Sequence, residues 1–257
     1  MMSSIIRNNW RRIFSIVFWI FLWQVISILV GREILIVSPI TVVKTLLELV
    51  KEIGFWSSLY YSFIRIAIGF LFAVVVGILL ASVSSQNILF RELLYPPTTI
   101  IKSTPVASFI IIALIWIKSE NLSVFISFLM VLPIIYTNTL KGIENADKKL
   151  LEMAQVFKVG VLKKIRYIYI PEIMPFFISA CSVSLGLCWK SGIAAEVIGL
   201  PKGSIGEKLY QAKIFLNTGE LFAWTLVIII VSIVFEKLFI YLLKKLQVEV
   251  LGSELQK

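Results

Sequence analysis

The sequence of 257 residues contains no histidine and only two cysteines. Histidine is the commonest acid–base residue and metal ligand, so its absence removes the usual basis for either kind of site. A nucleophile elbow and a phosphate-binding glycine loop are absent as well. Cys181 and Cys188 lie near one face of one expected helix, and we interpret them as small apolar packing residues rather than as a disulfide or metal ligands. We therefore expect no catalytic residue, metal site or cofactor within this polypeptide.

Acidic residues are few: the chain has 15 Asp and Glu residues and 25 Lys and Arg residues, which gives a net charge of +10. A basic balance can indicate a nucleic-acid partner, but these residues are scattered between apolar runs, where the positive-inside rule explains them better. With the N-terminus in the cytoplasm, the inner segments hold fourteen basic residues and the outer segments seven. We therefore predict that both termini and the segment 141–171 are cytoplasmic, and we expect no nucleic-acid partner.

Long apolar runs make up most of the chain. Hydrophobic residues account for 59% of it and the mean hydropathy is +0.94, which is too apolar for a soluble domain. Crossing the hydrocarbon layer takes about 20 apolar residues. Six runs are long enough, near 13–31, 59–83, 88–117, 122–140, 173–196 and 221–243. We predict an all-α, polytopic membrane protein in which residues 1–257 form a single transmembrane domain with six transmembrane helices.

Two of these runs need comment. The first follows several arginines, as a signal peptide does, but it is longer than a signal core and no small-x-small cleavage site follows it, so we interpret it as a retained helix. The third is too long for one straight helix and contains Pro96, Pro97 and Pro105. Proline removes a backbone donor and kinks helices, so we expect this span to be broken at these positions.

The segment 141–171 places many charged residues between two apolar runs. Apolar side chains recur there at helical spacing, at Leu150, Met153, Ala154, Phe157, Val161, Ile165 and Ile168. Polar and charged residues fall on the other faces, at Glu152, Gln155, Lys158, Lys163 and Arg166. The pattern predicts a helix with one face for the protein and one for a soluble partner, with a turn at Gly160. The alternative is a short amphipathic helix lying on the bilayer surface.

This segment resembles the "EAA" loop of binding-protein-dependent ABC importer permeases. Glu152-Met153-Ala154 stands at the E-A-A position, and Pro171 follows nineteen residues after the glutamate, as in that motif. Lys158 occupies the motif's glycine position, so we expect the turn to be rebuilt around Gly160. The resemblance implies a coupling helix that docks on an ATP-hydrolysing subunit. It implies coupling roles for Glu152, Met153, Ala154, Phe157, Lys158, Gly160 and Pro171.

Further segments resemble the nitrate/sulfonate/taurine branch of these permeases, from Pro39 to about Leu243. In the second span, Gly69, Ala73 and Gly77 recur every four residues and predict close helix packing. Arg65 lies in the same span, and we expect it to snorkel or to pair rather than to touch substrate.

The pathway candidates come from the third and fifth spans. Lys190 lies about 22 Å along the helix from Pro175, and its charge would cost on the order of 3 kcal/mol in lipid. We therefore expect it to face a hydrated cavity or a partner; the alternative is a charge network with Glu196 or near Arg65 and no ligand. In the third span, the segment from Lys102 to Ala107 resembles a basic-x-x-P-x-x-A segment of the same family, which implies that this span also lines the pathway. The alternative is that its proline only kinks the helix for packing. In the fifth span, Trp189, Glu196, Gly199 and Gly203 resemble the family's W…AE…G…G-x-G pathway motif. The candidates are therefore Lys102, Pro105, Trp189, Lys190, Glu196, Gly199 and Gly203.

Together these features imply a permease subunit of an ATP-driven importer in the bacterial plasma membrane. The resemblance implies a homodimer, two ATP-binding subunits that hold ATP and Mg, an extracellular substrate-binding protein, and a small polar or anionic solute as cargo. A membrane scaffold or sensor whose hairpin binds a signalling partner is one alternative, and an ABC permease for a vitamin precursor is another. An ion-driven transporter would need intramembrane carboxylates, and only Glu196 and Glu236 lie near spans.

Overall fold

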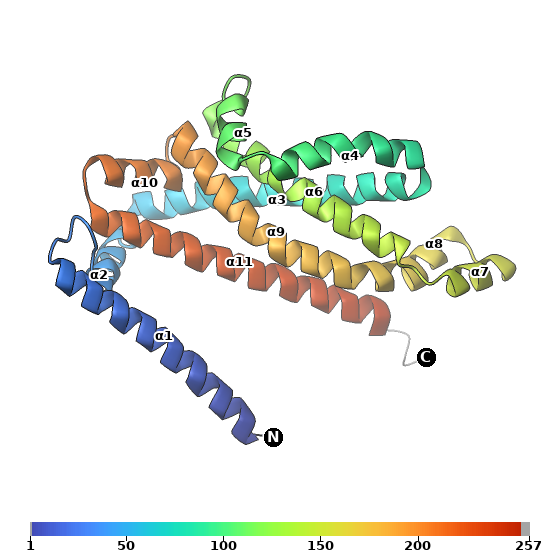
Figure 1. Ribbon diagram of the computed structural model, residues 1–257, viewed down its shortest axis with the longest axis horizontal. Helices are drawn as coiled ribbons and strands as arrows, with labels where there is room; N and C mark the ends of the chain where they lie inside the picture. The colour runs from blue at the N-terminus through green and yellow to red at the C-terminus, as the bar shows by residue number, and fades with distance from the viewer. Residues whose placement is uncertain (1, 253–257) are drawn as a thin grey trace.

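The computed structural model describes residues 2–252, and within that range the chain forms helices and no strand. Figure 1 shows their arrangement. In chain order the elements are α1 (Met2–Val30), α2 (Pro39–Leu49), α3 (Ile53–Gln86), α4 (Ile88–Ser103), α5 (Val106–Ala113), α6 (Ser119–Glu144), α7 (Lys148–Val156), α8 (Val161–Lys164), a π-helical turn (Ile165–Tyr169), α9 (Ile170–Gly199), α10 (Ile205–Ile214) and α11 (Thr218–Gly252).

Five helices of the described chain, α1, α3, α6, α9 and α11, are long and apolar enough to cross a membrane. They confirm five of the six expected spans, and most extend beyond the expected ranges. The third expected span consists of two shorter helices, α4 and α5. Pro105 separates them, and Thr104 before it has extended backbone (φ −86°, ψ 135°), because a residue preceding proline avoids the helical region. The expected break at Pro96 and Pro97 is wrong, since both lie inside the continuous helix α4.

The core lies where α6 packs between α3 and α9, with α11 along the outer side of α9 (Figure 1). The small residues of α3 permit this packing, as predicted. A Cβ atom on Gly69 would lie 2.5 Å from the carbonyl oxygen of Val124, and one on Gly77 would lie 2.8 Å from a side-chain carbon of Ile135. Helices that meet at such positions approach backbone to backbone, which fixes the register of α3 against α6.

The bundle has two distinct ends. At one end, which we call the hairpin end, α3 turns into α4, α6 leads into α7, and α11 finishes (Figure 1). At the other, the α10 end, α10 and α2 lie across the ends of the long helices. Asn87 forms the sharp turn at the hairpin end, because its side chain accepts hydrogen bonds from the amides of Leu89 and Phe90 and caps α4. α1 stands away from the bundle, and its described side chains are mostly exposed.

Candidate functional site

The hairpin formed by α7 and α8 projects beyond the bundle at the hairpin end (Figure 1). Asp147 caps α7 by accepting a hydrogen bond of 2.8 Å from the amide of Lys149. At the other end, the amide of Val159 binds the carbonyl of Ala154 (2.8 Å) and that of Lys158 binds Gln155 (3.0 Å). This pair of bonds is a Schellman motif, which requires a left-handed residue at its turn.

Lys158 supplies that left-handed residue, with φ of +49°. The expectation that the turn is rebuilt around Gly160 is therefore wrong. Gly160 has φ of −62° and instead forms the start of α8. The lysine keeps the conformation for which glycine is favoured because the two hydrogen bonds of the motif fix the backbone around it.

The turn also divides the apolar residues of the hairpin into two sets, so the expectation of one continuous stripe is wrong. Ala146, Ala154 and Ile168 are buried and pack together, with Leu151 and Val159 against them. Ala154 is only 1% exposed, and its contacts lie within the chain rather than on an outer face. It therefore holds the hairpin together and is not available to a partner.

The second set is exposed. We call it the hairpin patch, and it consists of Met153, Val156, Phe157, Val161 and Leu162, whose exposed fractions run from 51% to 83%. The charged side chains of Glu152 and Lys158 are exposed beside it, as is Gly160, and Pro171 is half-buried at the start of α9. Large apolar side chains gathered on a projecting element mark an interaction surface.

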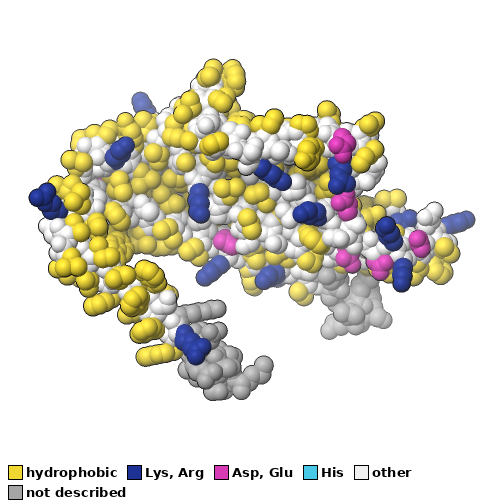
Figure 2. All heavy atoms as spheres, viewed as in Figure 1, with side chains coloured by type: hydrophobic (Ala, Val, Ile, Leu, Met, Phe, Trp, Pro, Cys, Tyr) yellow, Lys and Arg dark blue, Asp and Glu magenta, His cyan; other side chains and the backbone are white. Residues whose placement is uncertain are grey.

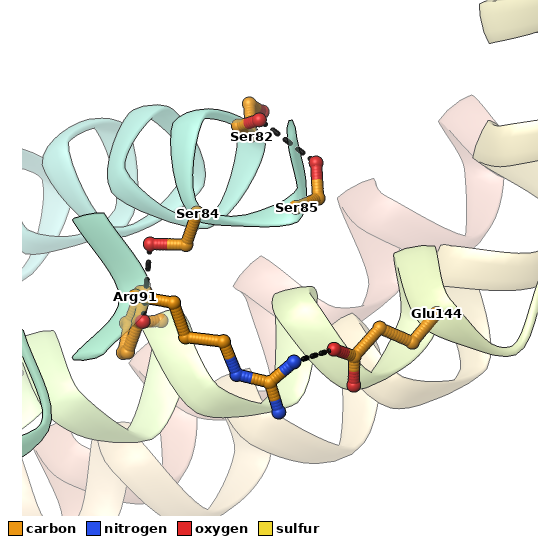
Figure 3. Close-up of polar contacts among 6 residues, drawn as sticks. Ser82, Ser84, Ser85, Arg91 and Glu144 are labelled. Atoms are coloured by element: carbon orange, nitrogen blue, oxygen red, sulfur yellow. Dashed lines mark hydrogen bonds and ion pairs between the residues drawn. The ribbon is translucent and has the colours of Figure 1, made fainter. Parts of the chain in front are cut away.

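A polar groove of 410 Å³ lies between α4 and α6 on the hairpin half of the molecule. Its lining side chains are mostly charged or hydroxyl-bearing. An ion pair between Arg91 of α4 and Glu144 of α6 crosses it, and Figure 3 shows the two side chains reaching toward each other. Beside it, the hydroxyl groups of Tyr136 and Ser84 lie 3.1 Å apart and join α6 to the end of α3. These contacts tie three helices together at the hairpin end.

Two of the predicted pathway lysines have exposed side chains. Lys102 lies near the end of α4 and its Nζ donates to Thr137 Oγ1 on α6 at 3.5 Å, while Pro105 is exposed at the start of α5. Lys190 is exposed on α9. Figure 2 shows Lys and Arg side chains on the face where α4, α6 and α9 lie. Because a charge is costly in hydrocarbon, a span face that carries exposed lysines belongs against water or a partner rather than lipid.

Glu196 and Trp189 lie elsewhere, and for them the expectation of an open pathway position is wrong. Trp189 is 1% exposed and packs on Phe63, with ring centroids 5.9 Å apart. Glu196 is fully buried; its Oε2 accepts hydrogen bonds from Ser62 Oγ (2.6 Å) and from the amide of Gly206 (3.3 Å). The same Ser62 oxygen accepts a bond of 2.9 Å from the amide of Ile205. Glu196 thus fastens the first turn of α10 to α9 and α3.

Glycine is required where α10 meets this carboxyl group. A Cβ atom on Gly206 would lie 2.3 Å from the Cβ of Glu196 and 2.4 Å from its carbonyl carbon. Of the other predicted glycines, Gly199 packs against Leu122, while Gly203 is exposed in the loop before α10 with φ of +78°. The site residues therefore fall into three separate groups: the hairpin, the lysine-bearing face and the buried α10 anchor.

The proposed network around Lys190 does not form among the described residues, because no ion pair joins it to Glu196 and the bonds of Glu196 go to Ser62 and Gly206. Arg65, expected to snorkel or to pair with an acid, forms no ion pair among the described residues and contacts an aromatic ring and an amide oxygen instead. Its guanidinium lies 4.2 Å from the ring centroid of Tyr61 and donates to Asn121 at 3.4 Å. The sequence reading missed the role of Ser62. It lies three residues before Arg65 in the second span, but its partner Glu196 is 134 residues away.

A bundle of membrane-length helices with a projecting hairpin defines a polytopic membrane protein. Comparison with known proteins gives the family. Residues 73–248 match the family described as "Binding-protein-dependent transport system inner membrane component", and the chain belongs to it. It is a membrane-spanning permease component of a binding-protein-dependent ABC importer, in the multi-pass inner-membrane class.

Curated relatives confirm the expected relation to the nitrate, sulfonate and taurine permeases. SsuC of Bacillus subtilis, described as an aliphatic sulfonates transport permease, is 27% identical over 82% of this chain and 77% of its own length. The nitrate import permease NrtB of Synechococcus elongatus is 28% identical over 74% and 72%, and the taurine permease TauC of Escherichia coli 22% over 83% and 80%. The fold resembles the crystal structure of an amino acid ABC transporter with histidines (TM-score 0.51, 19% identity, 74% of this chain and 88% of that chain).

Proposed function

We propose that the whole chain forms one transmembrane domain that pairs with a second copy and lines the import pathway of a small anionic solute. Two ATPase subunits bind the hairpins of the two copies and carry the ATP and Mg. An extracellular binding protein delivers the solute to the α10 end. In this arrangement the hairpin end and both termini are cytoplasmic, the orientation that the distribution of basic residues favours.

The observation that carries this proposal is the hairpin patch. Two of its members, Phe157 (73% exposed) and Leu162 (83% exposed), lie on the two arms of a short hairpin beyond the bundle. Ala154 and Ile168 pack together inside the hairpin and make it a single packed unit, so a displacement of the hairpin can move α6 and α9, to which it is joined. ATP-driven closure of the two ATPases would move both hairpins together and turn the helix bundles as rigid bodies.

The nature of the cargo rests on charge. The relatives are named for nitrate, aliphatic sulfonates and taurine, solutes that each bear a small anionic group. Lys102 and Lys190 are exposed on spans of this chain. A hydrated cavity lined by single lysines attracts an anion without the multiple contacts that would hold it tightly, which suits a pathway that must release its cargo.

The test places a charge in the hairpin patch. Phe157→Asp and Leu162→Asp should each weaken ATPase binding by roughly 2 kcal/mol or more, about thirtyfold. The reason is that an apolar side chain which the bound ATPase would cover becomes a carboxylate. Co-purification of the ATPase and ATP-dependent uptake in vesicles are measured together. Ile53→Asp is the matched control for the co-purification, since Ile53 is 90% exposed at the opposite end of the bundle. Retention of the ATPase and full uptake by both hairpin variants would refute the docking site.

A further inference from the structure

The groove between α4 and α6 has a composition that the hairpin does not explain. Its lining comprises three cations, two carboxylates and four hydroxyl groups, with Tyr136 and Leu140 behind them: Arg91, Lys102, Lys141, Glu92, Glu144, Tyr95, Thr98, Thr99 and Thr137. Arg91 lies in the first turn of α4 and Glu144 ends α6, while Lys102 lies at the far end of α4. The groove therefore runs from the hairpin end toward the middle of the bundle.

Of the three cations that line the groove, Arg91 is neutralised by a carboxylate and, among the described residues, the two lysines are not. Arg91 is paired with Glu144. Lys102 has a long hydrogen bond to Thr137 Oγ1 (3.5 Å), and Lys141 follows Thr137 by one helical turn on α6. Lys102 and Lys141 both line the groove. Glu92, the remaining acid of the lining, is exposed and forms no ion pair within the described chain.

Two ammonium groups that line one groove fit a bound anion. The ligand chemistry is that of a small oxyanion, whose oxygens can accept from both ammonium groups and from the hydroxyl of Tyr95. The threonine hydroxyls of the lining are polar neighbours rather than donors, because they donate to carbonyls of their own helices. We infer that the α4–α6 groove is an anion subsite in the hairpin half of the pathway, which takes the cargo's oxyanion group after it leaves the outer half. This inference rests on the proposed import function for its direction and its ligand.

The arrangement suits brief occupancy. Lys102 and Lys141 are both exposed, so each stays hydrated when the groove is empty, and no buried charge has to be neutralised by the ligand. The Arg91–Glu144 pair closes the hairpin end of the groove and joins α4 to α6 (Figure 3). A relative movement of these two helices changes the width of the groove and the distance between its lysines together.

A cysteine reporter tests the subsite without transport. Thr99→Cys is placed in a Cys181→Ala/Cys188→Ala background, because Thr99 is exposed in the groove and its hydroxyl bonds only within α4. The permease–ATPase complex is held in phosphatidylcholine nanodiscs. Reaction rates are compared for two small methanethiosulfonates, the ethylsulfonate anion and the ethyltrimethylammonium cation.

We expect the anion to react faster, and Lys102→Gln or Lys141→Gln to lower the anion-to-cation rate ratio by roughly five- to tenfold at low ionic strength. Millimolar nitrate should slow labelling relative to gluconate at equal ionic strength. A reporter at Ser85, exposed at the end of α3 outside this groove, is the control, and its ratio should change less than twofold.

Three results would overturn the inference: a ratio near one, a ratio insensitive to both lysines, or protection only when phosphatidylglycerol replaces phosphatidylcholine, which would assign the groove to lipid headgroups. The reporter needs no coupling to ATP hydrolysis. Failure of the hairpin variants with normal reporter behaviour would therefore remove the docking proposal and leave the subsite, and the reverse pattern would remove the subsite alone.

Discussion

Replacing Ser62 with alanine tests whether the buried carboxyl group of Glu196 holds α10 in place. Ser62 is fully buried and makes two hydrogen bonds, donating to Glu196 Oε2 at 2.6 Å and accepting from the amide of Ile205 at 2.9 Å. The substitution removes one hydroxyl group and therefore both bonds. It leaves a carboxyl oxygen with one fewer donor and a backbone amide with no acceptor, in a region closed to water.

The cost follows from these two losses. An unsatisfied buried amide costs about 1–3 kcal/mol, and the lost bond to the carboxyl group adds about 1–2 kcal/mol. The expected destabilisation is therefore about 2–5 kcal/mol. For a chain of this size it lowers the midpoint of thermal unfolding by roughly 5–15 °C. Because the freed amide, that of Ile205, belongs to the first turn of α10, that helix should loosen before the rest of the bundle.

The assay combines thermal unfolding in detergent with amide hydrogen exchange over Ile205–Ile214. Ser184→Ala is the matched control, since Ser184 is equally buried but donates only to the carbonyl of Cys181 in its own helix, at 3.2 Å. It should cost less than about 1 kcal/mol. The reasoning would be refuted if Ser62→Ala were no less stable than Ser184→Ala, or if exchange in α10 stayed at the wild-type rate.

Two further predictions concern the hairpin and the orientation. Lys158 has a φ of +49°, a conformation that costs about 1–2 kcal/mol for a residue with a Cβ atom. Lys158→Gly should therefore raise the midpoint of thermal unfolding, and the β-branched Lys158→Val should lower it. A midpoint lowered by glycine would contradict the left-handed turn. In a background free of the native cysteines, Lys148→Cys should be shielded from an impermeant thiol reagent in intact cells and Lys202→Cys should react. Labelling at position 148 in sealed cells would reverse the orientation.

Local patterns in the sequence were enough to predict the spans. The thickness of the hydrocarbon layer sets the length of the apolar run that crosses it, so five spans could be predicted directly from the sequence. Pro105 predicted the break between α4 and α5, because a residue before proline avoids the helical region. The small residues of α3 predicted its close contact with α6 for a similar reason, since only backbone approach requires them. The position and charge of the hairpin could also be predicted, because they depend on residues that are neighbours in the chain.

Other features depend on residues that only the folded chain brings together. Ser62 and Glu196 are 134 positions apart and Arg91 and Glu144 are 53 apart, and neither sequence neighbourhood marks its partner. For that reason a glutamate that matched a pathway motif could not be recognised as a buried anchor. Lys158 is a similar case: its left-handed turn is fixed by bonds to Ala154 and Gln155 and by the packing beneath them, which override the local preference for glycine. The segments long and apolar enough to cross the membrane are therefore identified from the amino-acid order alone, because length and polarity are local properties. Which polar groups face water and which face each other depends on how the helices pack, and so is known only from the folded chain.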